Sequence, residues 1–137
     1  MIGVSNQLVA FRLSDAGSAW VYSTGLIQLS PPAIATTTYF VSNQQNQEMV
    51  AVNASDRTSR WAYRGSSSTS PNTRMSSVGT EATLGADGVL YFGDNGGRLY
   101  ALIVDDTPQQ TAPGDWPRTG YDNCNSNHSN NTGFTCQ

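Results

Sequence analysis

A short pattern of alanine and tryptophan recurs along the chain and constrains its fold more than any other feature. Ala10 precedes Trp20 by ten residues, and Ala51 precedes Trp61 by the same distance, 41 residues further along. A third copy begins at Ala101, fifty residues after Ala51. Repeats of ~40–50 residues made of short strands are typical of β-propellers, in which each repeat forms a four-stranded blade. One blade cannot bury both of its faces, so the copies are expected to stack on one another.

The third copy is less regular than the first two. Its tryptophan is expected to be Trp116, which follows a longer insert at residues 107–114 that contains Pro and Gln. Upstream, Val-Ser-Asn stands at residues 4–6 and again at residues 41–43, and Phe-Gly-Asp-Asn takes the equivalent place at residues 92–95. Each copy therefore predicts a short apolar strand, a turn, a strand that carries the alanine, a second turn, and a strand opened by the tryptophan.

Strand and turn signals agree with this reading. Residues 90–92 and 99–104 are rich in β-forming residues and flank Asp-Asn-Gly-Gly at residues 94–97, a hairpin signal because Asn and Gly tolerate positive φ. No stretch has a capped helical period, and the prolines at residues 31–32 and at Pro71 would break a helix. The sequence therefore predicts an all-β fold.

The chain length and the repeat length together predict the number of blades. At ~40–50 residues per blade, 137 residues predict a partial β-propeller of about three four-stranded antiparallel blades. We place these blades roughly at residues 1–32, 33–78 and 79–118, followed by a polar tail at residues 119–137. Closed propellers usually have ~4–8 blades, so three blades leave open faces and edges that invite pairing. Self-association, or association with a further propeller segment, is expected rather than a compact monomer.

The same residues resemble a known family. The hairpin at residues 87–102, which reads DGVLYFGDNGGRLYAL, is similar to the repeat of bacterial PQQ-like β-propellers. The segment at residues 51–61 is similar to the tryptophan-docking segment of that family, and Trp-Pro followed by Asp at residues 116–122 is similar to a segment near a blade-closing strand. The resemblance covers roughly residues 1–122, and the hairpin motif is fairly specific for this propeller class because its spacing and its three copies agree.

Both docking segments depart from the family form, Ala-x-Asp-x-x-Thr-Gly-x-x-x-Trp. In the second copy Asn53 replaces the Asp and Arg57 replaces the Gly. In the first copy Arg12 stands at the Asp position, and Gly17 comes one place late. The length and both ends of the segment are kept in the two copies.

The resemblance implies a structural role for the repeated residues. Trp20 and Trp61 would pack against the neighbouring blade, where an indole ring removes a large apolar area from water. Ala10, Ala51 and Ala101 would be the other blade-docking residues. A tryptophan that stacks on a sugar is the alternative role.

Charge and residue types exclude several function classes. The net charge of −3 argues against a nucleic-acid partner, which a basic stripe would bind. No apolar run approaches the ~18 residues of a membrane helix, so no membrane span is predicted. Calcium needs ~6–8 oxygen ligands, but the two Glu residues are expected in a turn (Glu48) and before a strand (Glu81). The one acidic pair, Asp105 and Asp106, is expected at a solvated strand end.

Catalytic motifs are also missing from the sequence. The single histidine, His128, lies in a very polar stretch, and the chain has no Gly-x-Ser-x-Gly elbow or P-loop pattern. Quinone-dependent dehydrogenases of the resembled family use calcium and a catalytic Asp, but this chain has no adjacent cysteine pair and no Lys. We therefore predict no catalytic, cofactor-binding or metal-binding residues, and no cofactor.

Two cysteines lie close together in the tail. A disulfide between Cys124 and Cys136 would stabilise the protein by ~2–3 kcal/mol through chain entropy and would need an oxidising compartment. Two free, exposed thiols are the alternative.

These observations favour a non-catalytic scaffold or binding module over an enzyme. The resemblance implies a bacterial extracytoplasmic protein, periplasmic, on the outer-membrane surface or secreted, that is made as a longer precursor. Loops at residues 42–47 and 66–78 would meet a protein or glycan partner. The first alternative is the C-terminal fragment of a quinone (PQQ)-dependent oxidoreductase, and a sensor or ligand-binding domain fused to another module is the second.

Overall fold

The protein is built from β-strands. The computed structural model describes residues 2–4, 7–12, 14–23, 30–65, 75–78, 80–104 and 106. Within these ranges there are ten strands and no helix, so the prediction of an all-β chain is confirmed. The strands form three antiparallel sheets, in each of which they lie side by side in chain order.

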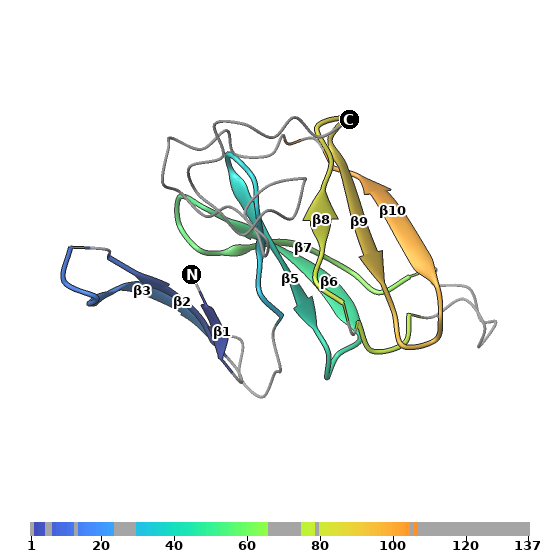
Figure 1. The fold of residues 1–137 in the computed structure, drawn as a ribbon, viewed down its shortest axis with the longest axis horizontal. Coiled ribbons are helices and arrows are strands. Elements are labelled where there is room, and N and C mark those ends of the chain that lie inside the picture. The colour runs from blue at the N-terminus through green and yellow to red at the C-terminus, as the bar shows by residue number, and fades with distance from the viewer. Residues whose placement is uncertain are drawn as a thin grey trace, which may run out of the picture.

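The three sheets follow one another along the chain. The first sheet consists of β1 (Ile2–Val4), β2 (Gln7–Phe11) and β3 (Ser18–Ser23). The middle sheet consists of β4 (Ala33–Ile34), β5 (Thr38–Asn43), β6 (Glu48–Asn53) and β7 (Ser59–Tyr63). The third sheet consists of β8 (Thr83–Leu84), β9 (Val89–Gly93) and β10 (Leu99–Ile103). Figure 1 shows them in this order, from the blue first sheet through the teal and green middle sheet to the yellow and orange third sheet.

The number of strands per sheet differs from the expected four. The middle sheet has four strands, whereas the first and third sheets have three each over the described part of the chain. Trp116, both cysteines and the tail at residues 119–137 lie outside the described residues. The predicted third-copy tryptophan strand and the predicted disulfide lie there too.

The spacing of alanine and tryptophan produces the same hairpin twice. Ala10 of β2 lies opposite Trp20 of β3, and Ala51 of β6 lies opposite Trp61 of β7. In both hairpins the register shifts immediately after the alanine, so each has a bulge at the same place. A bulge adds one residue to one strand and increases the local twist. The ten-residue spacing is therefore the length of one bulged hairpin.

The turns of these two hairpins also match. Arg12 donates its backbone N–H to the carbonyl of Gly17 (2.8 Å), and Asn53 donates to the carbonyl of Thr58 (2.9 Å). Ala16 and Arg57 occupy the same place in the two turns and have positive φ angles of 54° and 64°. The glycine of the resembled family falls at this place, and the left-handed backbone explains why glycine suits it.

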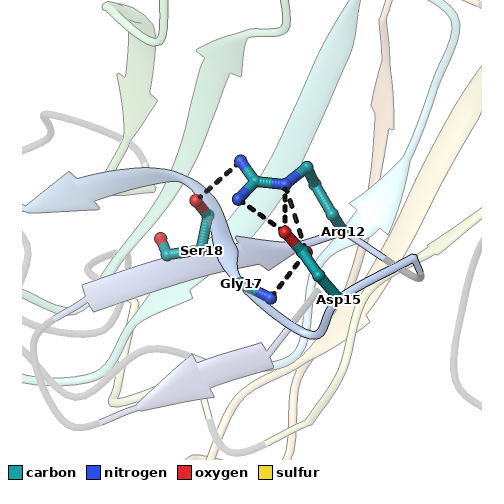
Figure 2. A network of polar contacts seen from close by, with 4 residues as sticks. All are labelled: Arg12, Asp15, Gly17 and Ser18. Carbon is teal, nitrogen blue, oxygen red and sulfur yellow. Dashed lines mark hydrogen bonds and ion pairs between the residues drawn. The ribbon is translucent and has the colours of Figure 1, made fainter.

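An aspartate closes each turn in the same way. The Gly17 N–H donates to Asp15 Oδ1 (2.9 Å), and the Thr58 N–H donates to Asp56 Oδ1 (3.0 Å). In the first turn the Arg12 guanidinium also lies on the Asp15 carboxylate, 3.1 Å from Oδ2, and donates to the Ser18 carbonyl (Figure 2). The Arg12 contact, followed by the N–H of Gly17, lowers the pKa of Asp15.

Two apolar junctions join the sheets face to face. The first junction packs one face of the first sheet on the middle sheet, through Leu8, Trp20 and Tyr22 on one side and Tyr39, Val41, Val50 and Val52 on the other. The second junction packs the opposite face of the middle sheet on the third sheet, through Phe40, Met49, Ala51, Trp61 and Tyr63 on one side and Leu84, Leu90, Phe92, Tyr100 and Leu102 on the other. The middle sheet is covered on both faces.

The burial pattern of single strands follows from this stacking. Every residue of β6 except its last, Asn53, is buried, because neighbouring side chains point to opposite faces and both faces are covered. In β10, exposed and half-buried residues alternate instead, since only one face packs on the middle sheet. The continuous apolar run of residues 49–52 therefore marks the central sheet, and alternation marks an end sheet.

Two of the predicted surface loops are partly buried. Ser42 and Asn43, expected in an exposed loop, belong to β5 and are fully buried, so the turn covers only residues 44–47. In the loop predicted at residues 66–78, Met75 and Val78 are buried in the second junction. The loop was predicted from its Ser and Thr content, which does not reveal these two buried apolar residues. The prediction of an exposed loop is wrong for residues 75–78.

Candidate functional site

An open groove lies between the outer strand of the middle sheet and the last strand of the third sheet. Its volume is about 540 Å³. It is lined by Thr38, Phe40, Arg60, Trp61, Tyr63, Ala101, Leu102, Ile103, Val104 and Asp106. We refer to it as the β10 groove.

One side of the β10 groove is aromatic. Phe40 and Trp61 come from β5 and β7, and their ring centroids lie 5.8 Å apart with a tilt of 40°. Tyr63 meets the edge of Tyr100 on the third sheet at 6.2 Å. Because these rings also belong to the second junction, the sheets hold them in place without a ligand.

A polar network spans the same groove. Arg60 Nη1 donates to Thr38 Oγ1 (3.0 Å), and the Thr37 hydroxyl donates to Asp106 Oδ2 (2.7 Å). The Thr37 N–H also donates to this carboxylate oxygen, at 3.2 Å. Asp106 is therefore half-buried and fixed to the middle sheet, which differs from the expected solvated strand end. Asp105 lies outside the described residues.

The edge strand β10 directs alternate backbone groups away from β9, toward the side of the groove. The Val104 N–H donates to the Gly88 carbonyl (2.9 Å), and β10 pairs with β9 in the same register. Since residues of an antiparallel strand point their backbone groups alternately to its two sides, Ala101 and Ile103 direct theirs away from β9. Among the described residues, no strand pairs with this side of β10.

This arrangement can bind an extended chain. A free strand edge offers main-chain donors and acceptors, and adjoining pockets receive alternate side chains of an added strand. Here the aromatic rings of the β10 groove would take apolar side chains, and Arg60 would take an acidic or amide group.

A second polar site, at Asp94, is structural. The buried Asp94 carboxylate accepts the N–H groups of Ser76 (2.9 Å) and Arg98 (3.0 Å) and the hydroxyl of Tyr100 (3.0 Å). Burial alone would raise the pKa of Asp94, but these hydrogen bonds outweigh it and hold the pKa below its usual range. Burial is also the main cause that raises the pKa of Tyr100. Asp94 therefore fixes the β9–β10 turn as an anion.

Glu48 has a similar structural role. It was expected in a turn, but it begins β6 and is buried. Its carboxylate accepts the Asn43 side-chain amide (2.6 Å) and the Arg64 guanidinium (2.7 Å). The position is therefore an internal hydrogen-bond centre of the middle sheet.

The predicted docking residues lie in three different environments. Trp20 stacks on Tyr39 of the middle sheet, with ring centroids 5.4 Å apart, and the Arg57 guanidinium lies 5.8 Å from the centre of its ring. Trp61 lies in the second junction and also lines the groove. Of the three alanines, Ala51 is buried, Ala10 is half-buried and Ala101 is exposed.

Over the described ranges, no three His, Cys, Asp or Glu side chains gather closely enough to hold a metal ion. In the same residues, no helix has the length and apolar character needed to cross a membrane. His128 lies outside them.

The roles of Arg60 and Asp106 in the groove were missed at the level of sequence. Arg60 directly precedes the repeated tryptophan, and Asp106 follows a strand, but nothing in either pattern shows that the two side chains line one groove. A usable signal existed for Asp94, because Asp-Asn-Gly-Gly predicts a tight hairpin whose first residue can accept turn N–H groups.

No known protein-family model matches the chain, and no curated protein matches it. The likeness to PQQ-like β-propellers therefore remains a prediction from the residues.

Proposed function

We propose that the chain is a segment of a PQQ-like β-propeller and acts as a non-catalytic binding or scaffold module. The repeated junction is the observation that carries this proposal: twice, a face with Ala opposite Trp packs on the next sheet. Contact between β4 and β8, the first strands of two successive sheets, supports it further. First strands line the central channel when propeller blades are arranged around an axis.

The partner that fits best is an extended segment of another protein. The edge of β10 that pairs with no strand among the described residues offers backbone groups, and the neighbouring groove offers Phe40, Trp61 and Tyr63. A glycan would use the aromatic rings but would leave the strand edge unused. We therefore place a peptide first and a glycan second.

The extracytoplasmic location belongs to the same proposal. Only 12% of the residues are charged and there is no Lys, which suits a β-rich surface outside the cytoplasm. Fractionation of the source cells with an antibody against the chain tests this location, and recovery from the cytoplasm alone would contradict it.

The binding experiment uses a library of random octapeptides, followed by amide exchange on the complex. We expect selected peptides to slow exchange at the amides of Ala101 and Ile103, with little change at Leu102, whose backbone already faces β9. Arg60→Ala should weaken binding by roughly tenfold, the effect of losing one hydrogen bond to a charged group.

The matched control is Arg12→Ala, which removes an exposed arginine far along the chain from the groove and should leave peptide affinity unchanged. Binding to a glycan array with no peptide binding would overturn the choice of partner. Reduction of a dye acceptor after addition of PQQ and calcium would overturn the non-catalytic proposal and favour the oxidoreductase alternative.

A further inference from the structure

The two end sheets expose apolar faces. On the third sheet, Leu99 is 78% exposed and Ile103 is 85% exposed, and the exposed Tyr91 and Ala101 lie on the same face. On the first sheet, Phe11 and Val21 are each 46% exposed. Contiguous exposed apolar residues on a protein surface commonly mark an interaction site.

The residues on the exposed face of the third sheet occupy the repeat positions that, in the middle sheet, lie on a covered face. Leu99 and Ala101 stand two residues apart, as Met49 and Ala51 do in the preceding copy. Met49 and Ala51 have no exposed surface, because the third sheet covers them. The outer face of the third sheet is therefore of the kind that packs on a following sheet.

The outer face of the first sheet is of the opposite kind. Val9, which is only 7% exposed, and Phe11 stand where Val50 and Val52 stand in the middle sheet, one residue before and one after the repeated alanine position in each copy. Val50 and Val52 are buried because the face with Trp20 packs on them. The outer face of the first sheet is therefore of the kind that receives a preceding sheet.

We propose that copies of this chain associate head to tail, with the outer face of β8–β10 of one copy packed on the outer face of β1–β3 of the next. Over the described residues, each chain has both halves of the junction that it already makes twice internally, and a second copy supplies a facing half at both ends of the stack. The contact joins two different faces, so it forms a closed ring or an open chain according to its rotation. The proposal rests on the stacked sheets and does not depend on peptide binding in the β10 groove.

Two single substitutions and their mixture test the direction of assembly by sedimentation velocity. Leu99→Asp places a carboxylate on the third-sheet face, and Val21→Asp places one on the first-sheet face. Each should weaken self-association by roughly a hundredfold or more, because an unpaired carboxylate would be buried in the contact. An equal mixture of the two variants should form a one-to-one heterodimer, since each retains the face that the other has lost.

Gln45→Asp, in an exposed turn on neither end face, is the matched control and should assemble like the wild type. A wild-type chain that remains monomeric at all concentrations would overturn the proposal. If Leu99→Asp also lowered the stability of that monomer, the chain's own residues would be covering the face. Association of Val21→Asp by itself would show like faces pairing, and this also contradicts head-to-tail packing. Octapeptide binding to monomeric Leu99→Asp separates failure of assembly from failure of the groove.

Discussion

Single residues in the two matched turns show which local preferences the fold overrides. Ala16 and Arg57 both adopt positive φ at the place where the resembled family has glycine. A left-handed backbone costs a residue with a side chain roughly 1–2 kcal/mol, and glycine loses more chain entropy on folding, roughly 0.5–1 kcal/mol. One difference between the two turns is that only Arg57 also lies over the Trp20 ring.

This difference predicts unequal responses to glycine. Ala16→Gly should raise the free energy of unfolding by about 0.5–1 kcal/mol, because it relieves the backbone and removes no contact of the exposed side chain. Arg57→Gly should change it by less than about 0.5 kcal/mol, since loss of the cation–π contact offsets the relief. Urea denaturation of the two variants measures both values. An equal gain in both turns would show that the Arg57 contact contributes nothing.

Asp94 gives a prediction for pH. Its folded pKa is lowered, so its contribution is fully present above its unfolded pKa of about 3.9 and is lost as the pH falls through the folded pKa. Asp94→Asn should lower stability at neutral pH by about 1–3 kcal/mol, because the Ser76 and Arg98 N–H groups bond different carboxylate oxygens and the amide nitrogen must face one of them. The difference in free energy of unfolding between Asp94→Asn and the wild type should narrow below about pH 4.

The control for this prediction is the same change at an exposed position. Asp87→Asn keeps an oxygen that can accept the Val89 N–H, so it should have little effect at any pH. Stability of both variants is measured by urea denaturation from neutral to acid pH. A gap at Asp94 that stays constant down to the lowest pH would contradict an ionised Asp94 in the folded protein.

At the scale of elements, the sequence predicted hairpins better than it predicted surfaces. The hairpin, its bulge and its turn all lie between Ala10 and Trp20, so they are local features. The same features recur in the second copy. Met75 and the β10 groove could not be predicted in this way. Their positions depend on how one sheet packs on the next, and such contacts join residues far apart in the chain.

The face-to-face junctions also predict how the sheets separate. Trp20 is the largest side chain of the first junction and packs on Tyr39. Because stacked repeats are stabilised mainly by contacts with their neighbours, Trp20→Ala should weaken this junction by about 2–3 kcal/mol, a part of the full cost of a buried tryptophan. Amide exchange should accelerate in β2 and β3 and remain slow in β6 and β9.

Trp20→Phe is the matched variant, since a smaller ring still stacks on Tyr39 and most of the protection of β2 and β3 should remain. Equal acceleration of exchange in all three sheets would mean that they unfold as one unit, contrary to independent neighbour contacts.

At the scale of the whole molecule, the described sheets form a repeating stack, and at each end one face is covered by no described sheet. The middle sheet shows the state of a sheet covered on both faces, with β6 buried almost throughout. Among the described residues, the first and third sheets each pack on another sheet through one face only, and Leu99 and Val21 lie on their other faces. The stability of such a stack should therefore depend on whether its ends are covered.

Head-to-tail contact makes thermal stability depend on protein concentration. A partner that binds only the folded chain adds about 2.7 kcal/mol at a concentration one hundred times Kd, and for a chain of this length each kcal/mol raises Tm by roughly 2–4 °C or somewhat more. The Tm of the wild type, measured by calorimetry, should therefore rise by several degrees across the concentrations over which it assembles. Gln45→Asp should follow the wild type, whereas Leu99→Asp should have one Tm at every concentration. A wild-type Tm that stays constant while sedimentation shows assembly would mean that unfolded chains associate as well, and the end faces would then not be the surfaces that join the copies.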